Sequence, residues 1–254
     1  MTKFMGLSKN LMFEKWKQMN WIVAIDLIFL LAITIIHIFT NGFSNQAEFL
    51  FVSFNITMVV ANIVAIIVLA RKNEQVLTSN NYRLLPVADT KLYLGNLLTA
   101  LLAFIYLQII EGVISGILYI FTNSDASSFG SFGNGNMFNA ALSVMLLMIL
   151  GLVVLWTGIT LVHLISNLIS GFLPFGRQKF VMFVLYLVII FVALGIFNYT
   201  TGNIFKMIYI NQELVNLNQF TDTVWISNGI FFAWSVVFSV INIYLLRRWT
   251  ETVR

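Results

Sequence analysis

The chain has no cysteine and only two prolines among its 254 residues, and charged residues make up just 9% of it. Without cysteine it can form neither disulfides nor thiolate metal sites, so redox chemistry does not indicate its compartment. Soluble domains carry about 25% charged residues, so this low value argues against an ordinary water-exposed surface. Hydrophobic residues reach 59%. The composition therefore predicts a protein that resides in a lipid bilayer.

The familiar catalytic signatures are absent as well. There is no GxxxxGK[ST] phosphate-binding loop, no HExxH, no GxSxG and no cluster of His and carboxylates suited to a metal. We therefore expect neither an ATPase site nor a metalloprotease site, and no cofactor bound by this chain itself. The net charge of +4 does not indicate nucleic-acid binding, because the basic residues are distributed as membrane topology requires.

What the sequence does contain is six long apolar segments. A hydrocarbon core of roughly 30 Å is crossed by about 20 residues of α-helix. The segments cover residues 21–40, 49–70, 94–121, 138–169, 180–197 and 225–246. The prediction is an all-α integral membrane protein with six transmembrane helices in a single domain over residues 1–254.

The basic residues lie in alternate gaps between these segments. All of the 14 Lys and Arg residues except Lys206 belong to the amino-terminal arm, the second gap, the fourth gap or the carboxyl-terminal tail. Basic residues close to the ends of spans stay in the cytoplasm during insertion. We therefore expect a multi-pass protein of the cell membrane with both termini cytoplasmic.

Two segments outside the spans also show helical patterns. Residues 3–19 place Phe4, Leu7, Leu11 and Phe13 near one another on a helical wheel, which predicts an interfacial helix over residues 1–20. Between the fifth and sixth spans, residues 198–224 carry apolar residues at helical intervals with amides between them. Two short re-entrant helices are typical of that pattern, and an amphipathic lid on the membrane surface is the alternative.

A few polar residues fall within the spans. Asp26 and Glu111 are the two acids embedded well inside them, and intramembrane acids are candidate functional residues because burying them is costly. Asp26 is close enough to the interface to pair with Lys15 or Lys17. Glu111 either faces a cavity on a substrate pathway or bonds a neighbouring helix. His163 and Ser166 resemble a base and a nucleophile, but no carboxylate lies near them in sequence, so we interpret them as structural.

The second inner gap is the most distinctive segment. After Arg71 and Lys72 it runs through a polar stretch to Arg83, Leu84, Leu85, Pro86 and Val87, then to Asp89 and Lys91. Pro86 favours an extended conformation at the residue before it, and Asp89 or Thr90 is suited to cap the next helix. The pattern predicts a short apolar knob joined rigidly to a transmembrane helix, which is suited to receiving force from a soluble partner.

Taken together, these features resemble the membrane subunit of ABC-2-type exporters. The likeness rests on the arm 3–19, on Leu84-Leu85-Pro86-Val87 followed by residues 94–98, and on the apolar segment 203–222. It covers nearly the whole chain in layout through short motifs. A basic or hydroxyl residue often follows the LPV element in that family, whereas Ala88 and Asp89 stand there in this chain.

The resemblance implies how such a protein would work. The loop at about residues 74–91 would hold a coupling helix that docks on a separate nucleotide-binding ATPase subunit, which supplies ATP and Mg²⁺. A second permease, either a copy or a homologue, would complete the transporter. We expect export of hydrophobic or amphipathic peptides, including antimicrobial peptides, from a bacterial cell. The alternatives are an ion-coupled secondary transporter or channel, and an intramembrane enzyme built on His163, Ser166 or Glu111.

Overall fold

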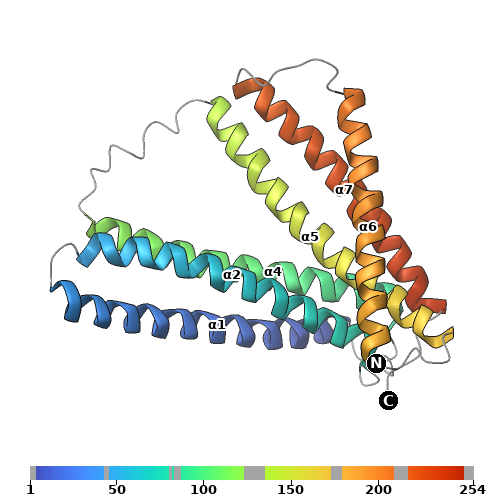
Figure 1. Cartoon of the computed structure of the whole chain (residues 1–254), viewed down its shortest axis with the longest axis horizontal. Coiled ribbons are helices and arrows are strands. Elements are labelled where there is room, and N and C mark those ends of the chain that lie inside the picture. Colours follow the sequence, from blue (N-terminus) through green and yellow to red (C-terminus); the bar gives the residue numbers. More distant parts are fainter. Residues whose placement is uncertain are drawn as a thin grey trace. The chain divides into compact units, whose positions relative to one another are not determined.

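The computed structural model describes residues 4–42, 46–79, 82, 87–122, 135–172, 179–208 and 217–248. They form six long helices (Figure 1): α1 Phe4–Asn41, α2 Gln46–Thr78, α4 Asp89–Phe121, α5 Gly135–Phe172, α6 Lys179–Ile208 and α7 Leu217–Arg248. All six are long and apolar enough to cross a membrane. Helices suit this environment because their backbone groups are hydrogen-bonded internally. The predicted all-helical class and the six candidate spans are therefore confirmed within the described residues.

The helices are longer than the apolar segments from which they were predicted. The shortest, α6, has 30 residues and the longest, α1 and α5, have 38, which corresponds to roughly 45 to 57 Å of helix. Apolar residues mark only the part of a helix that suits hydrocarbon, whereas polar residues continue the same backbone hydrogen-bonding pattern outside it. In a bilayer, helices of this length would extend past the hydrocarbon layer or cross it at a tilt.

The amino-terminal arm is helical, but it is not a separate element. Helix α1 runs without interruption from Phe4 to Asn41 and so joins the predicted arm to the predicted first span. Phe13 is 70% exposed, whereas Leu11 is buried, so these two residues do not share the face that the sequence suggested. The location of the arm in a membrane interface stays a prediction. At its other end α1 stops at Gly42, whose positive φ of 71° lets its N–H bond Ile38 O at 3.0 Å.

The segment between the fifth and sixth spans also differs from the expected layout. Residues up to Ile208 prolong α6, and residues from Leu217 belong to the start of α7. Most of the predicted re-entrant pair therefore continues the two flanking helices, and residues 209–216 lie outside the described residues. Amides between apolar residues are compatible both with separate re-entrant helices and with flanking helices that continue beyond the hydrocarbon layer. The sequence pattern alone therefore did not distinguish these two arrangements.

The helices belong to two compact units. The first contains α1, α2 up to Val76 and α4 from Lys91, and the second contains α5, α6 and α7. The single domain over residues 1–254 stays a prediction.

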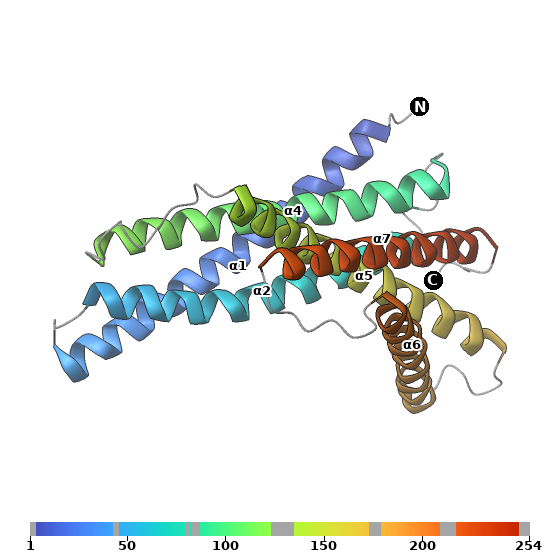
Figure 2. The same cartoon turned by 90° about the horizontal axis from the view of Figure 1, so that it is seen from above.

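In the first unit, successive helices alternate in direction, as successive membrane crossings would (Figures 1 and 2). Near the start of α1, Lys15 reaches Asn73 near the end of α2 and Asn96 near the start of α4. Further along α1, Asn20 accepts a hydrogen bond of 2.8 Å from Tyr106 of α4. Helix α1 is therefore antiparallel to α2 and parallel to α4.

Helices α1 and α2 of the first unit each bury a narrow stripe of side chains, whereas α4 buries a broader face. The stripes recur every three or four residues, as one face of an α-helix does. Their buried members are Leu7, Leu11, Lys15, Met19, Ile22, Asp26 and Leu30 in α1, and Phe54, Thr57, Ala61, Ala65, Leu69, Asn73 and Val76 in α2. The remaining surface is largely apolar and exposed, as lipid contact requires. Of the polar residues in these stripes, Lys15 and Asn73 lie where three helices meet, and Asp26 of α1 contacts Thr57 of α2.

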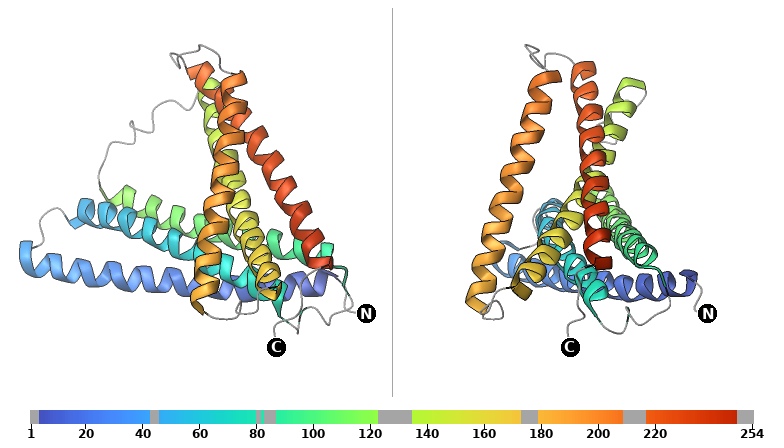
Figure 3. Two further views of the ribbon diagram at one scale, coloured as in Figure 1. Left: turned by 45° about the vertical axis from the view of Figure 1, so that its right-hand side comes forward. Right: turned by 90° about the vertical axis from the view of Figure 1, so that its right-hand side faces the viewer.

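In the second unit, α5 and α7 form a parallel pair along a seven-residue repeat (Figure 3). Asn228 Nδ2 donates to Ser143 O at 3.0 Å, and fourteen residues later on both helices Asn242 Nδ2 donates to Thr157 O at 2.9 Å. A Cβ at Gly151 or Gly158 would lie 3.8 Å from the Phe231 or Phe238 ring. Small residues and amide hydrogen bonds let helices approach closely in lipid, and these two glycines, seven residues apart on α5, lie at the contact with α7.

Helix α6 is the most exposed of the six helices over its most apolar stretch. No residue of its most apolar 18-residue window is buried. It contacts α5, and it meets α7 through Trp234, whose indole N–H donates to Thr201 at 3.3 Å and whose ring lies 5.4 Å from the Phe197 ring.

Candidate functional site

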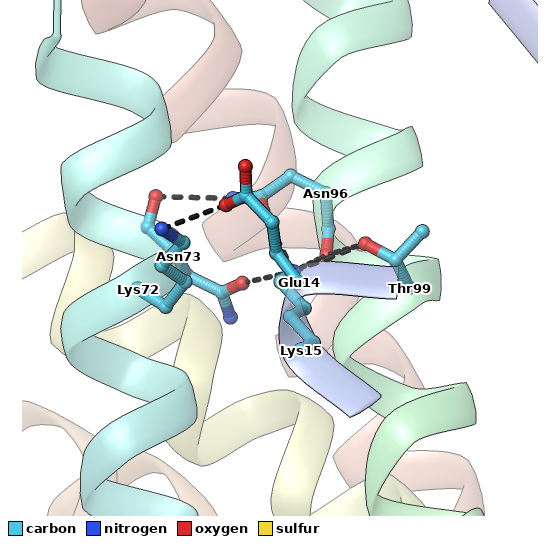
Figure 4. Close-up of polar contacts among 6 residues, drawn as sticks. All are labelled: Glu14, Lys15, Lys72, Asn73, Asn96 and Thr99. Carbon is cyan, nitrogen blue, oxygen red and sulfur yellow. Dashed lines mark hydrogen bonds and ion pairs between the residues drawn. The ribbon is translucent and has the colours of Figure 1, made fainter. Parts of the chain in front are cut away.

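The first unit contains a lysine whose ammonium group is completely buried. Lys15 has 0% of its surface exposed, and its Nζ lies 2.8 Å from Asn73 Oδ1, 2.6 and 2.8 Å from the O and Oδ1 of Asn96, and 3.0 Å from Thr99 Oγ1 (Figure 4). We refer to Lys15, Asn73, Asn96 and Thr99 as the Lys15 cluster. It joins α1, α2 and α4 at one point.

Neutral oxygens surround this charge in place of a carboxylate. An ammonium group has three N–H donors, and four oxygens lie within hydrogen-bond distance of Lys15 Nζ. Asn96 Nδ2 also donates to Asn73 O at 3.0 Å, which bonds α4 to α2 independently of the lysine. Because a buried ammonium without acceptors would cost several kcal/mol, the cluster holds the three helices in one relative arrangement.

An ion pair borders the cluster on its more exposed side. Glu14 Oε2 lies 2.8 Å from Lys72 Nζ, with side-chain exposures of 45% for the acid and 17% for the base (Figure 4). Half-exposed pairs of this kind contribute about 0.2 to 1 kcal/mol. The ion pair therefore contributes little to the stability of the contact between α1 and α2, and the hydrogen bonds of the buried Lys15 contribute more.

The sequence suggested Lys15 only as a basic residue of the arm and as one of two possible partners of Asp26, and it did not indicate a buried cluster around it. A signal was present nevertheless. Lys15 stands four residues after Leu11 and four before Met19, so it continues an apolar stripe, while Lys9 and Lys17 fall outside it. A lysine on such a stripe needs acceptors from neighbouring helices, and only the fold shows that Asn73 and Asn96 supply them.

A second polar group connects α2 and α4 deeper in the first unit. Glu111 is 2% exposed, and its Oε2 accepts from Asn62 Nδ2 at 2.9 Å and from Gln108 Nε2 at 3.2 Å. Gln108 Nε2 also donates to Asn62 Oδ1. Of the two sequence-based interpretations of Glu111, bonding to a neighbouring helix is the one observed. Glu111 and Asn96 are separated by roughly 22 Å along α4.

Replacing Asn62 should measure what this network contributes. Asn62→Leu would remove a donor to the buried Glu111 carboxyl group and an acceptor for Gln108, so we expect a loss of about 1 to 2 kcal/mol in unfolding free energy. Asn55→Leu is the matched control, because the Asn55 amide on the same helix is bonded to Phe51 O and no bond to Glu111 is described for it. Thermal unfolding in lipid nanodiscs would compare the two. Equal losses for both variants would contradict the assignment.

Asp26 lies at the boundary of a groove between α1 and α2. The groove has a volume of about 490 Å³ and extends from Ile22 to Ile33 on α1 and from Ser53 to Val64 on α2. Asp26 is 9% exposed and its carboxyl group contacts Thr57. Asp26 does not pair with Lys15, whose amino group is hydrogen-bonded to the neutral oxygens of its own cluster. No pairing with Lys17 is described either, and that side chain is exposed. Asp26 is also near enough to Glu111 for their charges to interact.

In the second unit, both ring nitrogens of His163 have hydrogen-bond partners, whereas a catalytic base needs one nitrogen available to the substrate. Its Nδ1 lies 2.7 Å from the Tyr186 hydroxyl and its Nε2 lies 3.0 Å from Asn167 Nδ2. Ser166 is fully buried, and no hydrogen bond is described for its hydroxyl. No described contact joins His163 to Ser166. The structural interpretation of both residues is thus the one that their surroundings favour.

The predicted coupling loop is only partly described. Arg83, Leu84, Leu85 and Pro86 lie outside the described residues, and Val87 and Asp89 are half-buried while Lys91 is exposed. Asp89 is the first residue of α4 and the only acid in its first turn, where a negative charge is favourable; its role as a cap stays a prediction.

Within the described residues, no group of three or more His, Cys, Asp or Glu side chains could hold a metal ion. Among the described residues, the first unit buries one lysine, Lys15, and two carboxyl groups, those of Asp26 and Glu111. No family model, curated protein or solved structure matched the chain. Its function has to be argued from these residues.

Proposed function

We propose that the chain is the membrane-spanning permease subunit of an ATP-driven exporter of the ABC-2 type, coupled to a separate nucleotide-binding subunit. The observation that carries the proposal is the Lys15 cluster. It bonds the amino-terminal helix to the two helices that adjoin the second inner loop, where the sequence predicts the docking knob.

The distances along the chain explain why this matters. Helix α2 ends at Thr78 and α4 begins at Asp89, so the connection is short. Asn73 precedes the end of α2 by roughly 8 Å of helix, and Asn96 follows the start of α4 by roughly 11 Å. Force applied to such a loop passes into two helices that are bonded to each other and to α1. The three helices would then move as one body, as they must if a separate ATPase subunit is to drive them.

The described charges are consistent with the orientation that this mechanism needs. Lys9, Lys17, Arg71, Lys72 and Lys91 all lie towards the end of the first unit that holds the Lys15 cluster. By the positive-inside tendency this end would face the cytoplasm, which places the loop where a soluble ATPase can reach it. In the proposed cycle, ATP binding by the partner subunits pushes the loops and switches a pathway between two permeases. The cargo would be hydrophobic or amphipathic peptides.

The test is whether the loop couples the chain to an ATPase. Tagged full-length chain purified with its lipids should retain a soluble subunit with Mg²⁺-dependent ATPase activity. Replacing both Leu84 and Leu85 by Asp should lower the recovered ATPase activity at least tenfold, because docking of an apolar knob does not tolerate two charges. Replacing Ser127 and Ser128 by Asp, in a loop predicted to face outward, is the matched control and should leave it unchanged.

The outcome is decided by two measurements on the same preparations. Thermal unfolding shows whether the Leu84 and Leu85 variant keeps its folded helices. If the wild-type chain retains no ATP-binding subunit, or if a folded loop variant retains it fully, the proposal fails.

One observation favours a second candidate, an ion-coupled secondary transporter. The first unit buries two carboxyl groups, Asp26 and Glu111, near enough to interact, and such acids act as relays in ion-driven carriers. This candidate requires transport that follows an ion gradient in proteoliposomes containing this chain alone. Transport that depends on ATP and an added ATPase would exclude it.

A further inference from the structure

We infer that the groove between α1 and α2 is a binding site for a lipophilic organic cation, which pairs its charge with Asp26 and its apolar body with the groove. The inference concerns binding by this chain alone and goes beyond the transport mechanism proposed above. Only the further step, that the bound cation is cargo, rests on the proposed function.

The size and lining of the groove fit a small apolar ligand. Sites for small organic molecules usually enclose about 300 to 1,000 Å³ and are mostly apolar with a few polar groups, and this groove measures about 490 Å³. Its side chains are aliphatic or aromatic apart from three residues, Ser53, Thr57 and Asp26. Ile25, Phe29, Ile56 and Val60 are all more than half exposed, so the groove opens at the lipid-facing surface of the first unit.

The carboxyl group determines which occupant is favoured. Asp26 is nine-tenths buried and lies in the lining, and none of the other lining residues is basic. The nearest buried ammonium group, that of Lys15, is satisfied by the oxygens of its own cluster. A lipid acyl chain would fill the volume but leave Thr57 as the one described partner of the Asp26 carboxyl group, and a carboxylate without a counter-charge is costly in hydrocarbon. A cation with an apolar body satisfies both requirements.

The test is equilibrium binding of tetraphenylphosphonium to the purified full-length chain in nanodiscs of zwitterionic phosphatidylcholine, with triphenylphosphine oxide as the uncharged probe. The wild type should bind the cation saturably and at least tenfold more tightly than the uncharged probe. Asp26→Asn should weaken cation binding at least tenfold and leave the uncharged probe unaffected. Glu48→Gln is the matched control, since it removes an exposed carboxylate from α2 outside the groove, and it should bind as the wild type does.

A second variant keeps the test decisive if Asp26→Asn does not fold. Val60→Trp keeps the carboxylate and fills an exposed part of the groove, so it should also weaken cation binding. The inference is overturned if folded Asp26→Asn binds the cation like the wild type, if Val60→Trp has no effect, or if the two probes bind equally well. It is likewise overturned if the wild type shows no saturable binding, as expected when an acyl chain or a second copy of the chain covers the groove. Because no ATPase is present, failure here leaves the proposed permease function to be decided by its own test.

Discussion

Replacing Lys15 by Met is expected to destabilise the protein by about 3 kcal/mol or more, because the side-chain oxygens of Asn73 and Asn96 would lose their buried donor, whereas the Thr99 hydroxyl stays bonded to Asn96 O. Methionine fills much of the volume of the lysine stem, so the loss would report mainly on the hydrogen bonds. In a protein of this size it corresponds to a fall of roughly 6 to 12 °C in unfolding temperature.

The matched control is Lys17→Met on the same helix. Lys17 is exposed, so this variant removes the same charge at nearly the same depth without disturbing a buried contact, and its unfolding temperature should stay within about 2 °C of the wild type. Thermal unfolding in nanodiscs measures both. If the two methionine variants unfold at the same temperature, the Lys15 cluster does not hold the three helices together.

The second large effect is expected at the contact between α5 and α7. Gly158→Leu would place a branched side chain where even a Cβ lies 3.8 Å from the Phe238 ring, so the two helices would have to separate. Over-packing of this kind costs about 1 to 3 kcal/mol, and we expect the upper end because the seam is rigidly spaced by two interhelical amide hydrogen bonds.

Two other variants isolate the steric cause. Gly158→Ala adds only the Cβ at ordinary contact distance and should be tolerated, with a gain in helix propensity offsetting any small strain. Gly195→Leu is the control on α6, where nothing lies within 4 Å of the added Cβ. The unfolding temperature should be lowest for Gly158→Leu, and those of the other two variants should stay close to the wild type. A Gly195→Leu variant as unstable as Gly158→Leu would mean that leucine itself, and not the seam, is responsible.

The sequence was sufficient for features that depend on local pattern. Six apolar segments identify six helices because hydrocarbon thickness sets a minimum length for each, and Asp89 indicates where α4 begins. Boundaries were less certain for a physical reason. Residues 198–208 and 217–224 carry apolar residues at helical intervals with amides between them, which suggested separate short helices, yet the same pattern also fits the ends of the two flanking helices.

Contacts between residues of different helices could not be predicted from the local sequence pattern. Glu111 could be identified as a costly buried acid, but its partners Asn62 and Gln108 are chosen by the rotation of α2 against α4. The same holds for Asp26, which the sequence allowed to pair with Lys15 or Lys17 and which instead contacts Thr57 at the groove. Both acids had several partners within reach along the chain, and only packing selects among them.

The sequence by itself determined that this protein is a set of six apolar helices without a nucleotide or metal motif, since composition and periodicity depend on each segment alone. Only the tertiary structure decided that Lys15 belongs to the interior, that α5 and α7 share a seven-residue seam, and that Asp26 lines an apolar groove. The physical reason is that a buried polar group is stable only beside specific partners, and those partners come from helices far apart in the chain.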